Sequence, residues 1–257
     1  MSSEHINYLN KKKKEKILVI ITQITIFILF ITIWEILSKN NIINTFLTSS
    51  PSLIIKTIIN LFNSNNLFNH IWITTYETTI SFILSTLLGI IFATILWWNK
   101  FIYKVFEPYL TILNSLPKVS LGPILIIWIG ANIKSIIVMA LLISTIISII
   151  TIYNGFNNVD ENKIKLMRSF NANKYQIYKM LIFRSNIPTI ISSLKINISM
   201  CLIGVIMGEL LVSKEGIGYL IMYGSQVFNL NLVMTGIFLL CILAYILYFI
   251  ISHIEKN

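Results

Sequence analysis

Long apolar runs recur along the sequence and limit what it can fold into. Runs of roughly 20 residues with few charges occupy 17–37, 73–98, 135–153, 189–212 and 230–252. A helix rises about 1.5 Å per residue, so each run is long enough to cross a hydrocarbon core of ~30 Å. Backbone groups find no water in lipid, and helices satisfy their own hydrogen bonds there. With an irregular sixth run at 108–130, the sequence predicts an all-α, polytopic membrane protein with about six transmembrane helices.

The composition supports this class and excludes others. Hydrophobic residues make up 56% of the chain and charged residues 12%, about half of the ~25% that soluble domains carry. The net charge of +10 would suggest nucleic-acid binding in a soluble protein, but these positive residues lie between apolar runs, where they orient the chain in a membrane. Cys201 and Cys241 lie inside apolar runs, which indicates small buried hydrophobic residues rather than a disulfide framework.

The distribution of positive charge predicts an orientation. With six spans, fourteen of the 20 Lys and Arg residues fall on the side of the N-terminus and four on the other side, with Lys118 and Lys195 near or within spans. Positive residues concentrate in cytoplasmic loops. We therefore expect a single transmembrane domain over 1–257 in the cell membrane, with a cytoplasmic tail at 1–16 and a cytoplasmic loop at 154–188.

The sixth run, at 108–130, contains helix-breaking residues. Pro117 and Pro123 flank Lys118, and a proline inside a membrane helix frees carbonyl groups that protein or a water-filled cavity must satisfy. One interpretation is a broken helix lining a translocation path, in which Lys118 attracts an anionic solute. The other is that Lys118 lies near the cytoplasmic interface and extends its ammonium group into water.

The run at 189–212 carries small and polar residues on one helical face. Asn197, Gly204 and Gly208 share this face, and the small-xxx-small spacing permits close helix approach. The face either lines a translocation path at a homodimer axis or packs within the chain. Glu209 follows it, and a carboxylate at this depth must face protein or water. We predict that Glu209 accepts hydrogen bonds from backbone amides of the turn at 215–218.

The segment 154–188 is the longest polar stretch between apolar runs. Ile164, Met167 and Phe170 recur at helical spacing, and Asn171 is of a residue type that tolerates the left-handed conformation ending a helix. A second short helix then carries Tyr175. Two short amphipathic helices form a compact knob that either fills a groove on a partner protein or lies on anionic lipid headgroups.

Several segments resemble one family of transport proteins. The sequence LPKVSLGPILIIWIG at 116–130, GELLVSKEGIGYLI at 208–221 and SSPS at 49–52 carry the resemblance. They are similar to the nitrate/sulfonate/taurine-type permease subunits of binding-protein-dependent ABC importers. The segment 154–188 corresponds to that family's cytoplasmic coupling loop, but it departs from the family pattern at Lys165, Asn171 and Arg184. The resemblance covers roughly 48–250 of the chain.

This resemblance implies a fold, partners and docking residues. The fold would be a type I ABC importer permease-like bundle, paired with a second permease copy as a homodimer. A cytoplasmic ABC ATPase dimer would hold the coupling loops, and an extracytoplasmic substrate-binding protein would deliver a sulfonate-, taurine- or nitrate-like anion or a vitamin precursor. Within the loop, Asn171 would set the turn and Lys165 and Arg168 would contact the groove rim. The ATPase-docking residues would be Lys165, Met167, Arg168, Ser169, Phe170, Asn171, Ala172 and Tyr175, with Met167, Phe170, Ala172 and Tyr175 as apolar anchors.

No catalytic function is expected of this chain. It has no Gly-rich Lys-Ser/Thr loop for nucleotide phosphates, no paired carboxylates or Ser/His/Asp set, and no Cys/His spacing for a metal. The chain is therefore not predicted to be an enzyme or to hold a cofactor, and ATP and Mg²⁺ would bind the partner subunit. The alternative is a secondary transporter driven by an ion gradient, with Glu77 and Glu209 as proton carriers, which would work alone and without ATP.

Overall fold

The computed structural model describes residues 3–64 and 66–256, which form helices and connections without a strand. The elements are α1 (Ser3–Lys39), α2 (Thr45–Thr48), α3 (Pro51–Asn63), α4 (Leu67–Trp98), α5 (Lys100–Ser115), the 3₁₀ turn η1 (Lys118–Leu121), α6 (Gly122–Ile129), α7 (Ile133–Asn157), α8 (Glu161–Ser169), α9 (Lys174–Ile177), the π-helical η2 (Tyr178–Ile182), α10 (Phe183–Ser185), α11 (Ile187–Val212), α12 (Ile217–Gln226) and α13 (Leu230–Lys256).

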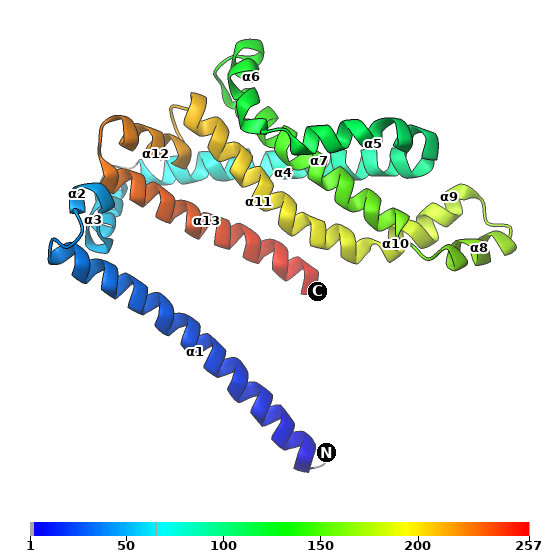
Figure 1. Cartoon of the computed structure of the whole chain (residues 1–257), viewed down its shortest axis with the longest axis horizontal. Coiled ribbons are helices and arrows are strands. Elements are labelled where there is room, and N and C mark those ends of the chain that lie inside the picture. Colours follow the sequence, from blue (N-terminus) through cyan, green and yellow to red (C-terminus); the bar gives the residue numbers. More distant parts are fainter. Residues whose placement is uncertain (1–2, 65, 257) are drawn as a thin grey trace.

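The membrane-spanning helices agree with the apolar runs. Among the described residues, five helices are long and apolar enough to cross a membrane: α4, α7, α11, α13 and the part of α1 from Lys11 to Lys39. A sixth span is formed if α5 and the η1–α6 segment count as one broken helix. Figure 1 shows α4, α7, α11 and α13 running alongside one another, with α2, α3 and α12 at one end and α8 and α9 at the other. The prediction of an all-α bundle with about six spans is confirmed.

Helix α1 lies apart from the bundle. It contacts the rest of the chain mainly through α3, and none of its most apolar window is buried (Figure 1). The predicted tail at 1–16 is helical from Ser3 onward, and residues 1 and 2 lie outside the described part. Near its C-terminal end, the Glu35 carboxylate accepts a hydrogen bond from the Ser52 amide at 3.1 Å and pairs with Lys39 at 3.2 Å. The first of these contacts ties α1 to the start of α3.

The bundle is held together where small residues let helices approach. A Cβ on Gly208 of α11 would lie 2.9 Å from Cα of Ile136 on α7, and one on Gly204 would overlap the backbone of Ala140. On α4, a Cβ on Gly89 would lie 2.6 Å from Cβ of Ser148. Helices α4, α7 and α11 therefore form a closely packed three-helix core, and α13 packs on α11 and α12.

The third predicted span is broken as its prolines indicate. Helices α5 and α6 meet at a bend of 90°, with the break at Leu116 and Pro117 and with Pro123 in the first turn of α6. The helix begins at Lys100, earlier than the predicted 108, because the Asn99 side chain caps it by accepting from the Phe101 amide at 2.9 Å. Pro108 lies inside α5.

Candidate functional site

The segment 154–188 folds into the predicted pair of short helices. Helix α8 starts at a cap in which the Asp160 side chain accepts from the Asn162 amide at 2.8 Å. Asn171 ends it in the left-handed region, at φ 58°, which an asparagine tolerates better than most residues. Asn173 and Gln176 then form a reciprocal capping box for α9. We call this unit, from Asp160 to Ser185, the knob.

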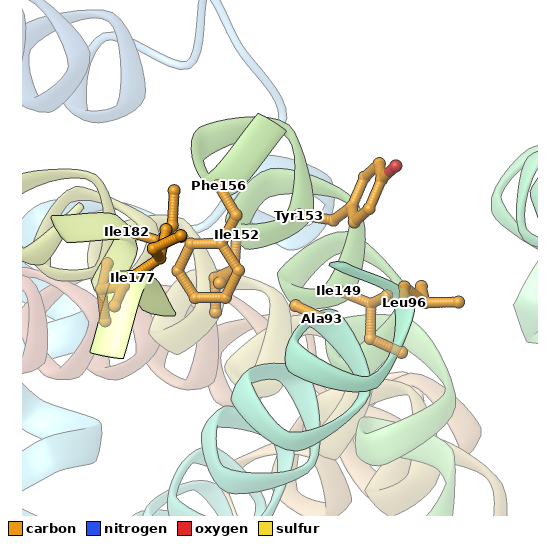
Figure 2. Packing of buried hydrophobic residues seen from close by; sticks show 9 residues of the cluster. Ala93, Leu96, Ile149, Ile152, Tyr153, Phe156, Ile177 and Ile182 are labelled. Carbon is orange, nitrogen blue, oxygen red and sulfur yellow. The ribbon is translucent and has the colours of Figure 1, made fainter. Parts of the chain in front are cut away.

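The inner side of the knob is packed against the spans. Ile177 and Ile182 are buried against Ile152 and Phe156 of α7, as Figure 2 shows. The same cluster includes Ala93 and Leu96 near the end of α4, so one apolar core joins the knob to two spans (Figure 2). Five further residues of the knob pack on its edge: Ile164, Met167, Ala172, Tyr178 and Phe183.

Polar and aromatic contacts add to this junction. The Tyr178 hydroxyl lies 2.7 Å from the hydroxyl oxygen of Thr94 on α4, and its ring packs on Trp97 at 5.4 Å between centroids. The Lys174 ammonium donates to the carbonyl of Trp98 and lies 5.4 Å from the centroid of that indole, within the range of a cation–π contact. The knob is therefore in direct contact with both α4 and α7.

The outer side of the knob carries exposed apolar residues. Phe170 is 75% exposed, and Leu166 and Tyr175 are each 58% exposed. Lys165, Arg168, Ser169 and Asn171 are also exposed. Met167 and Ala172, which were predicted as anchors beside Phe170 and Tyr175, are half-buried and pack in part against the chain's own core. Leu166 was missed as an anchor, although its position four residues before Phe170 places both on one helical face.

Beside this packed junction, a cavity of about 630 Å³ lies between the knob and the ends of the spans. Its lining combines indoles, cations and one carboxylate: Trp97, Trp98, Lys100, Glu161, Lys165, Arg168 and Lys174 are among the residues that form it. Lys165 and Arg168 thus border this cavity as well as the outer rim of the knob. Its chemistry suits an anionic headgroup at a membrane interface, where basic pockets between helices bind such lipids.

A polar cluster joins three helices at the opposite end of the bundle. The N-cap of α12, Gly216, has no side chain to satisfy the first amides of that helix. The Gly216 amide donates to Nδ1 of His70 at 3.0 Å, and the Ile217 amide donates to Oγ1 of Thr74 at 2.8 Å. Glu209 of α11 accepts from the Gly218 amide at 2.5 Å and from Thr74 at 2.7 Å. The prediction that Glu209 accepts a hydrogen bond from a backbone amide of the 215–218 turn is confirmed.

A further polar residue of α11 is buried between helices. Asn197 is 2% exposed and donates to the hydroxyl oxygens of Ser85 at 2.9 Å and Thr86 at 2.8 Å. With Gly204 and Gly208 packed on α7, this face serves helix packing within the chain, which is one of the two interpretations of the sequence. The sequence signal for the partners of Asn197 is the series of serines and threonines at helical spacing along α4.

The broken third span forms an exposed surface. Lys118 is partly exposed, and its ammonium donates to the Asn114 carbonyl at 3.4 Å, while Pro117 and Pro123 are exposed. Large apolar side chains near the C-terminal end of α6 are exposed too, with Ile127 at 81% and Trp128 at 77% exposure. In the described part of the chain, no group of three His, Cys, Asp or Glu residues is placed to hold a metal ion.

Comparisons with known proteins agree with this architecture. The family model described as "Binding-protein-dependent transport system inner membrane component" matches residues 85–255. A formylaminopyrimidine transport permease protein of Halalkalibacterium halodurans is 28% identical over 90% of this chain and 91% of its own length. A putative aliphatic sulfonates transport permease protein of Bacillus subtilis is 25% identical over 82% of this chain and 77% of its own length.

A solved structure shows the same fold. One chain of the inward-facing MetNI methionine ABC transporter superposes with a TM-score of 0.66, covering 74% of this chain and 95% of its own, at 18% identity. At that identity the likeness speaks for the fold alone.

Proposed function

This chain belongs to the family of binding-protein-dependent transport system inner membrane components, and we propose on that premise that it moves a small solute across the cell membrane in an ATP-driven importer. Members of the family are permease subunits rather than enzymes, and the ATPase is a separate subunit. In our proposal, the N-terminus and the knob lie in the cytoplasm. Solute arrives from an extracytoplasmic binding protein, and ATP and Mg²⁺ act on the partner ATPase.

The proposed contact with the ATPase is the outer side of the knob. Phe170, Leu166 and Tyr175 form an exposed apolar surface on two short, well-capped helices, which is the shape that fills a groove. Lys165, Arg168 and Ser169 surround this surface, and Asn171 sets the turn that presents Phe170. The observation that carries the proposal is the two-sidedness of the knob: its outer side is unpartnered and its inner side is continuous with α4 and α7.

The proposed mechanism follows from this two-sided packing. When an ATPase dimer closes, it moves two knobs, one on each of two permease copies. Ile177, Ile182 and Tyr178 then transmit that motion to the ends of α4 and α7, because they are in contact with both helices. The bundle thereby alternates between openings toward the two sides of the membrane. Met167 and Ala172 contribute by holding the knob to the spans rather than by contacting the ATPase.

The proposed solute is a small anion or a vitamin precursor. One relative is named for aliphatic sulfonates and another for formylaminopyrimidine, so both classes are covered by similar chains. Lys118, at the exposed bend between Pro117 and Pro123, favours an anion, since an ammonium group beside a water-filled path attracts negative charge. This bend is the part of the proposed path that remains exposed and free to face a second permease copy.

The test replaces the most exposed residue of the knob. We expect Phe170→Asp to abolish copurification with the ATPase and solute-stimulated ATP hydrolysis, because a carboxylate cannot enter an apolar groove without losing hydration. Phe228→Asp is the matched control: Phe228 is 73% exposed, has a positive φ like the turn residue Asn171, and lies at the other end of the bundle. Normal ATPase copurification by Phe170→Asp would overturn the docking proposal.

A reconstitution distinguishes the importer from the secondary-transport alternative. We expect no uptake by this chain alone in proteoliposomes with a pH gradient, and uptake when the ATPase, ATP and binding protein are supplied. Uptake driven by the pH gradient alone, and lost in Glu77→Gln, would instead support proton carriage by Glu77 and Glu209.

A further inference from the structure

Glu77 is a buried carboxyl group without a conventional partner. It lies on α4 within the apolar span, and none of its surface is exposed. In the described part of the chain, neither of its oxygens receives a hydrogen bond from an N–H or O–H donor. Thr74, three residues before Glu77 on α4, donates to the carboxyl group of Glu209 on α11, so Glu77 lies on the face of α4 that packs against this carboxyl group. Two carboxylate oxygens repel each other, so this arrangement requires a proton.

The surroundings supply no other countercharge. On α4, Nδ1 of His70 accepts the Gly216 amide, so this nitrogen carries no proton. Lys214 and Glu215, in the turn between α11 and α12, are exposed. Tyr219 of α12 stacks on His70. No ion pair to either glutamate is formed within 3–64 and 66–256.

The two carboxyl groups differ in what they already accept. Glu209 receives the Thr74 hydroxyl at 2.7 Å and the Gly218 amide at 2.5 Å, and it lies at the N-terminus of α12. Hydrogen bonds to the charged form and the positive end of a helix dipole both favour a carboxylate there. Glu77 receives no such donor. Of the two groups, Glu77 is therefore the one that holds the proton.

We propose that Glu77 is a neutral carboxylic acid whose O–H donates to the Glu209 carboxylate, so that a single bound proton closes the polar cluster between α4, α11 and α12. Glu209 then has three donors, one from α4 through Thr74, one from α4 through Glu77, and one from the first turn of α12. The proton is a structural ligand: it turns a repulsive carboxylate pair into a link between two spans and the helix that caps them.

The first test is spectroscopic and detects the protonated carboxyl group itself. In infrared spectra of the purified wild-type chain in lipid, we expect a C=O stretching band of a protonated carboxylic acid that shifts in D₂O. Glu77→Gln removes this band. Glu35→Gln is the matched control, because Glu35 is paired with Lys39 and the Ser52 amide and contributes no protonated carboxyl band.

The second test separates the hydrogen bond from the volume of the side chain. Glu77→Gln keeps an N–H donor at the same position, and Glu77→Met keeps the length without a donor. We expect the thermal midpoint of Glu77→Gln to stay near that of the wild type and that of Glu77→Met to fall by roughly 5 °C, the effect of leaving Glu209 with one donor fewer.

Either of two results would overturn the proposal. One is a spectrum in which Glu77→Gln leaves the protonated-acid band unchanged, which would place the proton elsewhere or show both groups ionised. The other is a thermal midpoint that falls as far in Glu77→Gln as in Glu77→Met. Neither readout depends on transport activity, so both stand whether or not the proposed importer function holds.

Discussion

The two ends of helix α4 are joined to the rest of the molecule by different kinds of contact. At its C-terminal end, Trp97 and Trp98 meet the knob through aromatic rings and an apolar core. At its N-terminal end, His70 and Thr74 meet α12 through hydrogen bonds to backbone amides. Apolar packing is non-directional, whereas hydrogen bonds weaken steeply when their angles change.

This difference suggests a division of mechanical roles. The polar cluster fixes the start of α12 in one geometry, because each of its first amides has a specific acceptor. The knob junction consists mainly of apolar packing, with Ile177 and Ile182 in the shared core, and Tyr178 adds a hydrogen bond to Thr94. In the proposed mechanism, the knob is the end that a partner moves and the polar cluster is the end that stays in place. Substitutions at the two ends should therefore differ in cost.

The largest loss of stability is expected for Gly216→Ala in the polar cluster. Gly216 has φ 102° and ψ 169°, a region used essentially by glycine alone, and a side chain there costs about 1–3 kcal/mol in strain. Its Cβ would also overlap the Glu209 carboxyl group, and overpacking adds about 1–3 kcal/mol. Gly224→Ala is the milder comparison, because Gly224 has helical geometry and its Cβ would lie 3.0 Å from a Val233 methyl group and 3.1 Å from backbone atoms of Asn229 and Val233, without the overlap found at Gly216. Thermal unfolding in detergent measures the stability of both variants. An equal loss in the two would show that Gly216 is no more constrained than Gly224.

An intermediate loss is expected for Thr74→Val, which removes one hydroxyl of the cluster without changing the side-chain shape. That hydroxyl donates to Glu209 and accepts from the Ile217 amide. Its removal leaves a buried amide and a carboxylate oxygen each short of a partner, at about 2–3 kcal/mol. Thr75→Val is the control, because the Thr75 hydroxyl bonds only the carbonyl of Ile71 in its own helix. A Thr74→Val chain as stable as its control would show that α12 is not held by this hydroxyl.

The smallest loss is expected for Tyr178→Phe at the knob, which removes one hydroxyl from the tolerant junction. Thr94 keeps its hydrogen bond to the Ile90 carbonyl at 2.7 Å, and the ring contacts remain, so the cost is about 0.5–1.5 kcal/mol. ATPase coupling should persist. Tyr175→Phe, on the exposed side, serves as the reference for a hydroxyl without this contact. If Tyr178→Phe cost more than Thr74→Val, the proposed contrast between the two ends would be wrong.

Local patterns predicted much of the fold and part of the site. The Ser50 side chain accepts from the Leu53 amide at the start of α3, with Pro51 in its first turn, and Asn171 has the left-handed backbone that its residue type suggested. Both depend on residues a few positions apart. Met167 and Ala172 were assigned to the outer side of the knob, since helical spacing alone does not say which face of a short helix meets the protein's own core.

The sequence by itself determined the class of molecule: the hydropathy of each run decides that it crosses a membrane, and caps and prolines decide where helices begin and break. Only the tertiary structure decided how polar residues are paired. Thr74 meets Glu209 across 135 residues and Ser85 meets Asn197 across 112, and no periodicity encodes such a pair. The physical reason is range: hydrophobic patterning acts through neighbours on one helix, whereas a buried hydrogen bond depends on which helices are adjacent and at what rotation.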